Sequence, residues 1–526
     1  MKTISHINRS AWIAGVFTVL LAAAGCTGNF EEINRNPNEV TEAEMQRENY
    51  KTGANVKGLI NLVVPAQEHM YQFNELLVSG SYAGYTEFTS DSKFEKFSTF
   101  NPTVDWLKWP FVNVISETYP YYRGVLNGTD NPVMRALADL LRVAIMHRVT
   151  DTYGPIPYSK VVEDKKESLS VGYDTQKEVY MKMFEELDAA IAVLKANTTL
   201  STEAFGKFDG VYGGNVGKWV KFANSLKLRM AMRLSNVEPE IAKAKAAEAI
   251  GSGVIESNED NAELTLAENR SALCWTNWND HRIGADLISV MNGYNDPRRE
   301  TMFTKVTVGK GETATQGFAG IRIGVYPGDS DAVKAGYSNM IIDSKSPYLW
   351  MNAAEITFLR AEYELRWGTD AAAGSLYEQA VKLSFEERGA KGAEDYLAQA
   401  DAVPENYQDN VGSDNCSAVS KITIPWETGN FDRNLERIIT QKWIAIFPLG
   451  TEAWAEHRRT GYPALFPAVN DKSGGSVDPA IGPRRLNYPV EEYTENAANV
   501  AAAVEMLGGP DTQGTHLWWD KTTSKN

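Results

Sequence analysis

The chain has 526 residues, of which 43% are hydrophobic, and its formal net charge at pH 7 is -16. This length can bury a sizeable core, and the acidic balance argues against nucleic acid or an anionic membrane face as a partner. The three cysteines, Cys26, Cys274 and Cys416, are too few for a disulfide framework. We expect Cys274 and Cys416 to be buried thiols, and a bond between them stays an open alternative.

The N-terminal leader predicts secretion followed by lipidation. Two basic residues precede an apolar run over 11–21, which is too short to remain as a membrane-spanning helix. Small residues then lead to Cys26, as in a lipobox, although Ala23 stands where leucine is usual. We therefore predict a lipoprotein signal peptide over 1–25 and a tether over 26–50 that begins with lipidated Cys26. The alternative is an ordinary cleaved signal with an incidental cysteine.

The rest of the chain, 51–526, is predicted to be a single, mainly α-helical domain. Apolar residues recur at helical spacing in many segments, and prolines or glycines punctuate them. The pair 352–367 and 371–386 has the small and aromatic positions of a tetratricopeptide unit, and an ordinary helical hairpin is the alternative. A short strand is expected over 320–326. The predicted helices span 56–73, 135–150, 173–194, 217–234, 239–250, 352–367, 371–386 and 432–447.

Two loop-rich insertions, around 79–130 and 255–345, interrupt these helices. Loops this long inside a compact protein are usually functional or disordered, and their aromatic content argues against disorder. Flat aromatic rings stack on the apolar face of a sugar ring. The two insertions are therefore the places where we expect a ligand to bind.

The best ligand candidate is the segment 275–282 in the second insertion. Trp275 and Trp278 could form a stacking platform, and the polar side chains that follow could bind vicinal hydroxyls. The alternative is that both tryptophans fill the helical core while the polar residues cap a turn. The predicted ligand-binding residues are Trp275, Asn277, Trp278, Asp280, Arg282, Tyr85, Trp106 and Tyr326.

Enzymatic motifs are not found in the sequence. There is no nucleophile elbow, no complete phosphate loop and no metal-ligand spacing among the six histidines. We therefore predict no catalytic residue, no metal and no cofactor. Glu452 with Arg458 and Arg459 could clamp an anion, but a buried Arg–Glu network that locks the last long helix to the body is the better interpretation.

An ordered set of motifs resembles the SusD/RagB family of surface lipoproteins of the Bacteroidetes, especially its second large branch. The most specific stretch runs from Gln441 through Glu452-Ala453-Trp454 to Pro463. The other motifs follow the family's order along nearly the whole mature chain. They are Phe30–Asn34, Asn36–Asn38, Thr150–Tyr158, Lys218-Trp219 with Ala223–Arg229, Ala354-Glu355 with Arg360–Glu362, and Arg484–Leu486 with Tyr488-Pro489.

The resemblance implies a SusD-like helical fold with four degenerate tetratricopeptide hairpins and a loop-rich region that faces the ligand. It also implies a lipid-anchored protein of the outer membrane that faces the cell exterior. Such proteins capture glycans for a SusC-like TonB-dependent transporter. Capture of peptides with the same transporter is the alternative, and a surface hydrolase is a weaker one. Family members vary in their binding residues, so the resemblance assigns no ligand contact here.

Overall fold

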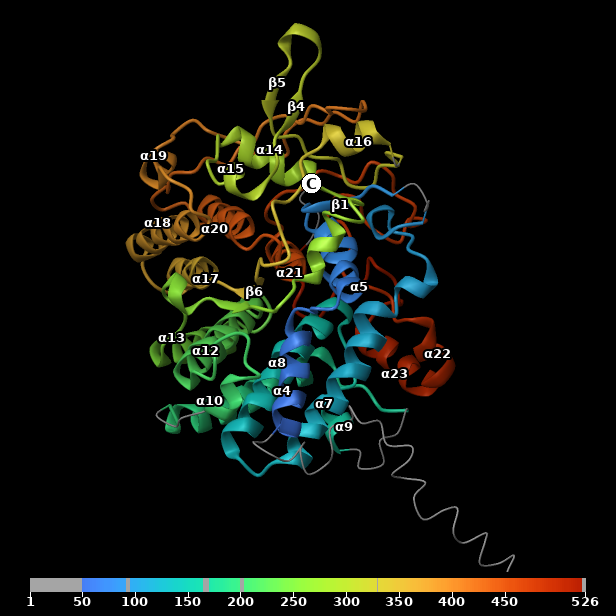
Figure 1. Ribbon diagram of the computed structural model, residues 1–526, viewed down its shortest axis with the longest axis vertical. Helices are drawn as coiled ribbons and strands as arrows, with labels where there is room; N and C mark the ends of the chain where they lie inside the picture. Colours follow the sequence, from blue (N-terminus) through green and yellow to red (C-terminus); the bar gives the residue numbers. More distant parts are fainter. Residues whose placement is uncertain (1–49, 91–94, 164–169, 199–202, 329, 523–526) are drawn as a thin grey trace, which may run out of the picture. The chain divides into compact units, whose positions relative to one another are not determined.

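The computed structural model describes residues 50–90, 95–163, 170–198, 203–328 and 330–522 (Figure 1). The predicted signal peptide, Cys26 and all but the last residue of the predicted tether lie outside these residues. The chain divides into two units, 1–51 and 52–526. The helices and strands of the fold from residue 52 onward belong to the second unit.

Prolines and a capping side chain set the boundaries of the first helices. The helix predicted over 56–73 is instead two helices, α4 (Tyr50–Val63) and α5 (Glu68–Tyr71), because Pro65 lacks the N–H that continuation needs. After α7 (Val114–Gly128), α8 (Pro132–Tyr153) begins with proline in its first position. The Asn131 side chain accepts the backbone N–H of Val133 at 2.9 Å.

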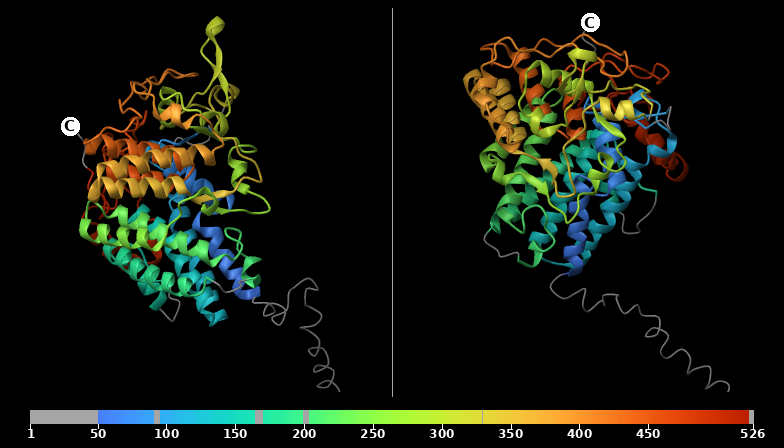
Figure 2. Two further views of the ribbon diagram at one scale, coloured as in Figure 1. Left: turned by 90° about the vertical axis from the view of Figure 1, so that its left-hand side faces the viewer. Right: turned by 45° about the horizontal axis from the view of Figure 1, so that its top comes forward.

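Long helices pack in succession and make the fold mainly α-helical, as predicted. α10 lies against α8, α12 lies against both α10 and α13, and α17 lies against α18 and α20 (Figures 1 and 2). Whether four such pairs are tetratricopeptide hairpins stays a prediction. The bounds are α10 Gln176–Ala196, α12 Val216–Arg233, α13 Pro239–Ser252, α17 Ala353–Trp367, α18 Asp370–Glu387, α20 Phe431–Ala445 and α21 Gly450–Thr460. Shorter α-helices are α6 Ser79–Tyr82, α9 Ser159–Glu163, α11 Glu203–Gly206, α14 Ala285–Gly293, α15 Arg299–Met302, α16 Asp331–Gly336, α19 Ala393–Leu397, α22 Val490–Glu495 and α23 Ala497–Leu507.

The strands are short and pair across large sequence separations or within hairpins. β1 (Thr86–Phe88) pairs antiparallel with β3 (His281–Ile283), and β2 (Ala262–Leu264) pairs with β6 (Tyr348–Met351). β4 (Val306–Val308) and β5 (Thr315–Gly317) form a hairpin that projects from the helices in Figures 1 and 2. The prediction of a strand over 320–326 is wrong, because this segment contributes only an isolated β-bridge between Ile321 and Gly284.

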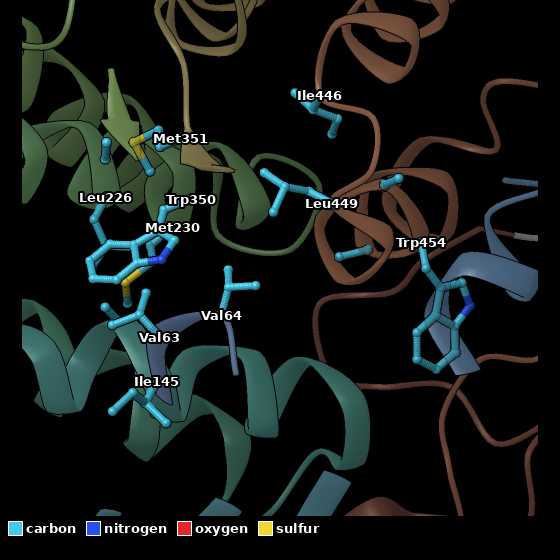
Figure 3. Packing of buried hydrophobic residues seen from close by; sticks show 14 of the residues in the cluster. Val63, Val64, Ile145, Leu226, Met230, Trp350, Met351, Ile446, Leu449 and Trp454 are labelled. Atoms are coloured by element: carbon cyan, nitrogen blue, oxygen red, sulfur yellow. The ribbon is translucent and has the colours of Figure 1, made fainter. Parts of the chain in front are cut away.

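The core forms where the N-terminal helices meet the later ones. Figure 3 shows Trp350 of β6 beside Leu226 and Met230 of α12, with Val63 of α4 and Ile145 of α8 nearby. All five side chains are buried. None of the helices in the described part of the chain combines the length and apolar character that crossing a membrane requires. Cys274 and Cys416 are both free thiols, the first buried and the second half-buried.

A buried ion cluster ties these helices together. Arg459 of α21 reaches both carboxylate oxygens of Glu362 on α17, each at 2.6 Å, and Arg233 of α12 lies 2.6 Å from Glu452. The predicted Arg–Glu network is therefore confirmed for Glu452 and Arg459, whereas Arg458 donates to backbone carbonyls, among them that of Arg484 at 2.9 Å. The cluster consists of Asp151, Arg229, Arg233, Glu355, Glu362, Lys442, Glu452, Glu456 and Arg459, which come from α8, α12, α17, α20 and α21.

Acid is expected to remove the stability that this cluster contributes. Burial alone would raise the pKa of Glu452, but Arg233 and Lys442 beside it lower the pKa to about 2. A carboxyl group whose pKa is depressed by folding contributes stability above its unfolded pKa, which is about 4.3 for glutamate, and loses it as the pH falls. The free energy of unfolding, measured in urea, should therefore fall between about pH 4.5 and about pH 2. In a Glu452→Gln variant this fall should be shallower, and an identical fall would contradict the assignment.

Candidate functional site

The two loop-rich insertions meet at the β1–β3 ladder. Its register places Phe88 opposite His281 and Thr86 opposite Ile283, so residues far apart in sequence become neighbours. The turn that enters β3 is made by Asn279, whose φ of 51° lies in the left-handed region that asparagine tolerates better than most residues. The segment 275–280 is thereby held beside the first insertion.

A row of aromatic rings runs across this junction. Trp278 stacks on His69 with 4.8 Å between ring centroids and 17° between planes. The centroid of the His69 ring lies 6.1 Å from that of Trp109. Trp109 in turn stacks on Phe73 with 5.0 Å between ring centroids and a 2° interplanar angle. Trp106 and Phe73 form a T-shaped pair with 5.5 Å between ring centroids. Both insertions thus contribute rings to one continuous set.

Part of this row faces solvent, and we call that part the aromatic face: His69, Trp106, Trp109 and Trp278, with Asn277 and Asp280 at its edge. His69 and Asn277 are exposed, and the three tryptophans and Asp280 are half-buried. Partly exposed rings next to amide and carboxylate groups are the side chains that bind the apolar face and the hydroxyls of a sugar. The geometry therefore suits a flat, hydroxylated ligand.

π-Helical turns position two of the rings. Phe73 belongs to η2 (Gln72–Val78) and Trp109 begins η5 (Trp109–Asn113), and both segments are π-helical. Such segments are rare and frequently occur at functional sites. On the other side, Trp278 follows η7 (Arg270–Cys274), and its backbone N–H donates to Leu273 at 2.9 Å.

Asp280 is an ionised group held in place by its neighbours. Burial raises the pKa of its carboxyl group, but the adjacent His281 and the hydrogen bonds from His281 and Gln72 lower the pKa on balance. The His281 ring nitrogen Nδ1 lies 2.7 Å from one carboxylate oxygen, and Gln72 donates to the other at 3.2 Å. The carboxylate is therefore fixed at the edge of the aromatic face, where it can accept hydrogen bonds from a ligand.

Three predicted ligand-binding residues are buried instead. Trp275 and Tyr85 are each 1% exposed, and the Tyr85 ring stacks on Trp443 at 5.4 Å. Arg282 is also 1% exposed, and its guanidinium group donates to backbone carbonyls, among them that of His281 at 2.6 Å. The expected stacking platform of Trp275 with Trp278 is therefore wrong in its first member. These residues support the site from within and cannot touch a ligand in this conformation.

Tyr326 is 37% exposed and lies beside the first insertion rather than in the row of rings. The Lys96 ammonium group lies 5.2 Å from its ring centroid. Lys96 also pairs with the buried Glu87 carboxylate at 2.8 Å, and the next residue, Phe97, stacks on Trp106 at 5.8 Å. Tyr326 thus contacts Lys96, and Phe97, the next residue along the chain, stacks on Trp106.

Sequence reasoning missed His69, and it named Trp109 only as a further candidate of the first insertion, outside the predicted set. His69 and Phe73 are four residues apart, a spacing that puts two rings on one helix face, and this signal was present in the sequence. Within the described residues, no three or more His, Cys, Asp or Glu side chains gather in a way that could hold a metal ion.

Replacing Asn277 with alanine is expected to weaken binding of a hydroxylated ligand at the aromatic face about fivefold, because one hydrogen bond contributes about 1 kcal/mol. The side chain is exposed, so the free energy of unfolding should change by less than about 0.5 kcal/mol. Calorimetric titration and urea unfolding measure the two effects. The matched control is Asn127→Ala at the exposed end of α7. Equal binding by both variants would remove Asn277 from the site.

Comparison with known proteins places the fold in a recognised group. The sequence matches the SusD-like family model, described as Susd and RagB outer membrane lipoprotein, over residues 32–520. None of the curated proteins matches the chain.

Solved structures align over most of the chain. A SusD homologue from Bacteroides thetaiotaomicron is 50% identical, with a TM-score of 0.85 over 90% of this chain and 100% of that one. A SusD homologue from Bacteroides uniformis is 42% identical, with a TM-score of 0.84 over 90% of this chain and 100% of that one. A chitin-binding SusD homologue from Flavobacterium johnsoniae is 34% identical, with a TM-score of 0.82 over 90% of this chain and 99% of that one.

Proposed function

The chain belongs to the SusD and RagB family of outer membrane lipoproteins, and from this premise we propose that it is a non-catalytic cell-surface protein that captures oligosaccharides. The observation that carries the proposal is the aromatic face, in which half-buried tryptophans lie beside an exposed amide and a fixed carboxylate. The chitin-binding relative supports a glycan as the ligand class. Cys26 carries the proposed lipid anchor, and the protein faces the cell exterior.

Binding at such a face is expected to be weak for a single site. Each stacked ring contributes on the order of 1 kcal/mol beyond desolvation, which favours micromolar or weaker affinity. We propose that a SusC-like TonB-dependent transporter receives the glycan. Confinement with the transporter raises the effective concentration and offsets the weak affinity. Purification of the lipoprotein with its barrel from outer membranes tests this partnership.

The experiment that tests the ligand class is calorimetric titration of the chain from residue 27 onward. The panel contains chito-oligosaccharides, other host, plant and microbial glycans, and mixed peptides. Saturable binding to one glycan class, with no binding of peptides, is the expected result. Binding of peptides alone would leave the family intact and favour the peptide-capturing alternative. Release of reducing ends during prolonged incubation would instead favour a hydrolase.

A further inference from the structure

A separate cavity of about 380 Å³ lies between α6, α14, α21 and the C-terminal loops. Its walls are largely apolar and come from segments distant in sequence, including Ile323, Leu465, Phe466 and Ile481. None of the residues that define the aromatic face lines it. This volume lies within the range of small-molecule sites in proteins.

Asp286, one of the residues that line this cavity, has a carboxylate oxygen without a hydrogen-bond partner among the described residues. Asp286 is 4% exposed, and its Oδ1 accepts the backbone N–H of Phe466 at 2.6 Å. Its Oδ2 is shielded from solvent and has no hydrogen-bond partner among the described residues. A buried polar atom without a partner costs free energy, and a buried charge without one costs more.

The neighbouring polar side chains of the cavity have partners already. The Tyr82 hydroxyl donates to Gln513 at 2.7 Å, and the His457 ring nitrogen Nδ1 lies 3.0 Å from the Pro463 carbonyl oxygen. Arg484 pairs with both oxygens of Asp520, at 2.7 and 2.8 Å. Asp286 therefore stands out among them as the group that lacks a counterpart.

A second unsatisfied atom lies one helical turn further along α14. Ser289 is 2% exposed, and its Oγ also lacks a partner among the described residues. Asp286 and Ser289 together line a small recess of about 20 Å³, which shares Ala464 and Phe466 with the larger cavity. A recess of this size admits roughly one water molecule or one small polar group.

The Asp286 carboxyl group has no bonded cation among the described residues. Burial raises the pKa of its carboxyl group to about 7, against the lowering effects of the Phe466 N–H and the Arg322 charge. The Arg322 side chain donates to the Pro467 carbonyl at 2.6 Å instead. Burial also lowers the pKa of His457 to about 4, which keeps this ring neutral near pH 7. Arg484 is neutralised by Asp520.

We propose that this cavity is a second ligand site, which binds a small primary amine through Asp286. The ammonium group meets the unsatisfied carboxylate oxygen and Ser289, and an apolar body fills the space beside Leu465 and Phe466. A neutral alcohol could donate one hydrogen bond, but an ammonium group also places a positive charge directly on the carboxylate, which Arg322 does not bond. The site is independent of glycan capture at the aromatic face.

Phenethylamine and its neutral analogue 2-phenylethanol test the proposal by calorimetry at pH 8. The wild-type protein should bind the amine saturably and the alcohol at least tenfold more weakly. Asp286→Asn, which keeps an acceptor for the Phe466 N–H, should weaken amine binding at least tenfold. Glycan binding should be unchanged in this variant, which separates failure here from failure of the glycan proposal.

Ala480→Trp provides a test that does not alter Asp286. Ala480 is exposed and lines the cavity, so the larger ring can fill the space without disturbing the core. Amine binding should be lost in this variant. The proposal is overturned if the wild-type protein does not bind the amine, if the alcohol binds equally well, or if either variant binds the amine as tightly as the wild type.

The same carboxyl group predicts a pH-dependent stability difference without any ligand. Its pKa is higher in the folded protein than the value of about 3.9 expected for unfolded aspartate. The folded state therefore loses stability as the pH rises from about 4 through about 7. The melting temperature of Asp286→Asn relative to the wild type should accordingly increase between pH 5 and pH 8. A constant difference across this range would contradict the raised pKa.

Discussion

Replacing Trp278 with alanine is expected to weaken oligosaccharide binding about 30-fold, equivalent to about 2 kcal/mol. The half-buried ring stacks on His69 and extends the aromatic face toward Asn277. Its removal takes away both a stacking partner for the sugar and the contact that orders His69. Calorimetric titration with the glycan that the panel identifies measures the loss.

Trp367→Ala is the matched control for this substitution. Trp367 is also half-buried, but it ends α17 and packs on Tyr363 with 5.4 Å between ring centroids. Its replacement should leave glycan binding unchanged. If Trp278→Ala folds normally and binds as the wild type does, or if both variants lose affinity equally, Trp278 is not part of a glycan site.

Replacing Arg459 with alanine is expected to lower the free energy of unfolding by about 3–5 kcal/mol, because two buried carboxylates lose one of the cations that compensate their charge. Arg459 is buried and is bonded to Glu362 and Glu456 at 2.6 and 2.7 Å. Both carboxylates are buried in the folded state. Urea unfolding followed by circular dichroism measures the change.

An exposed ion pair supplies the comparison. Lys182 and Glu185 lie 3.0 Å apart on α10, with side chains that are 48% and 70% exposed. Lys182→Ala should change the free energy of unfolding by about 0–1 kcal/mol, since water screens such pairs. A comparable loss in both variants would mean that burial of the ion cluster is not the source of its contribution.

Local signals in the sequence were sufficient for the helices but not for all of their boundaries. The apolar repeat and the flanking prolines and glycines predict α8, α12 and α17 to within a few residues. The prediction over 56–73 runs across Pro65, because the apolar pattern continues on both sides of the break. The helix predicted from residue 173 begins instead at Gln176, because Thr175 caps α10 in a capping box with Glu178.

The site was harder to predict, because burial depends on distant segments of the chain. Trp275 and Trp278 look equivalent in sequence, yet Trp275 is buried and Trp278 is half-exposed. The Asn339 side chain donates to the Trp275 carbonyl at 2.8 Å, and the Trp275 ring lies against His281 of the β1–β3 ladder, with 5.8 Å between ring centroids. Tyr85 is likewise covered by Trp443, a residue more than 350 positions away. No local pattern carries such information.

The measurement that tests the central claim most directly is a crystal structure of the protein with the glycan identified by titration. The account predicts a sugar ring stacked on Trp278 or Trp106, at a van der Waals separation of about 4 Å, with hydroxyl groups near Asn277 or Asp280. A glycan bound away from the aromatic face, including one in the cavity beside Asp286, would contradict it.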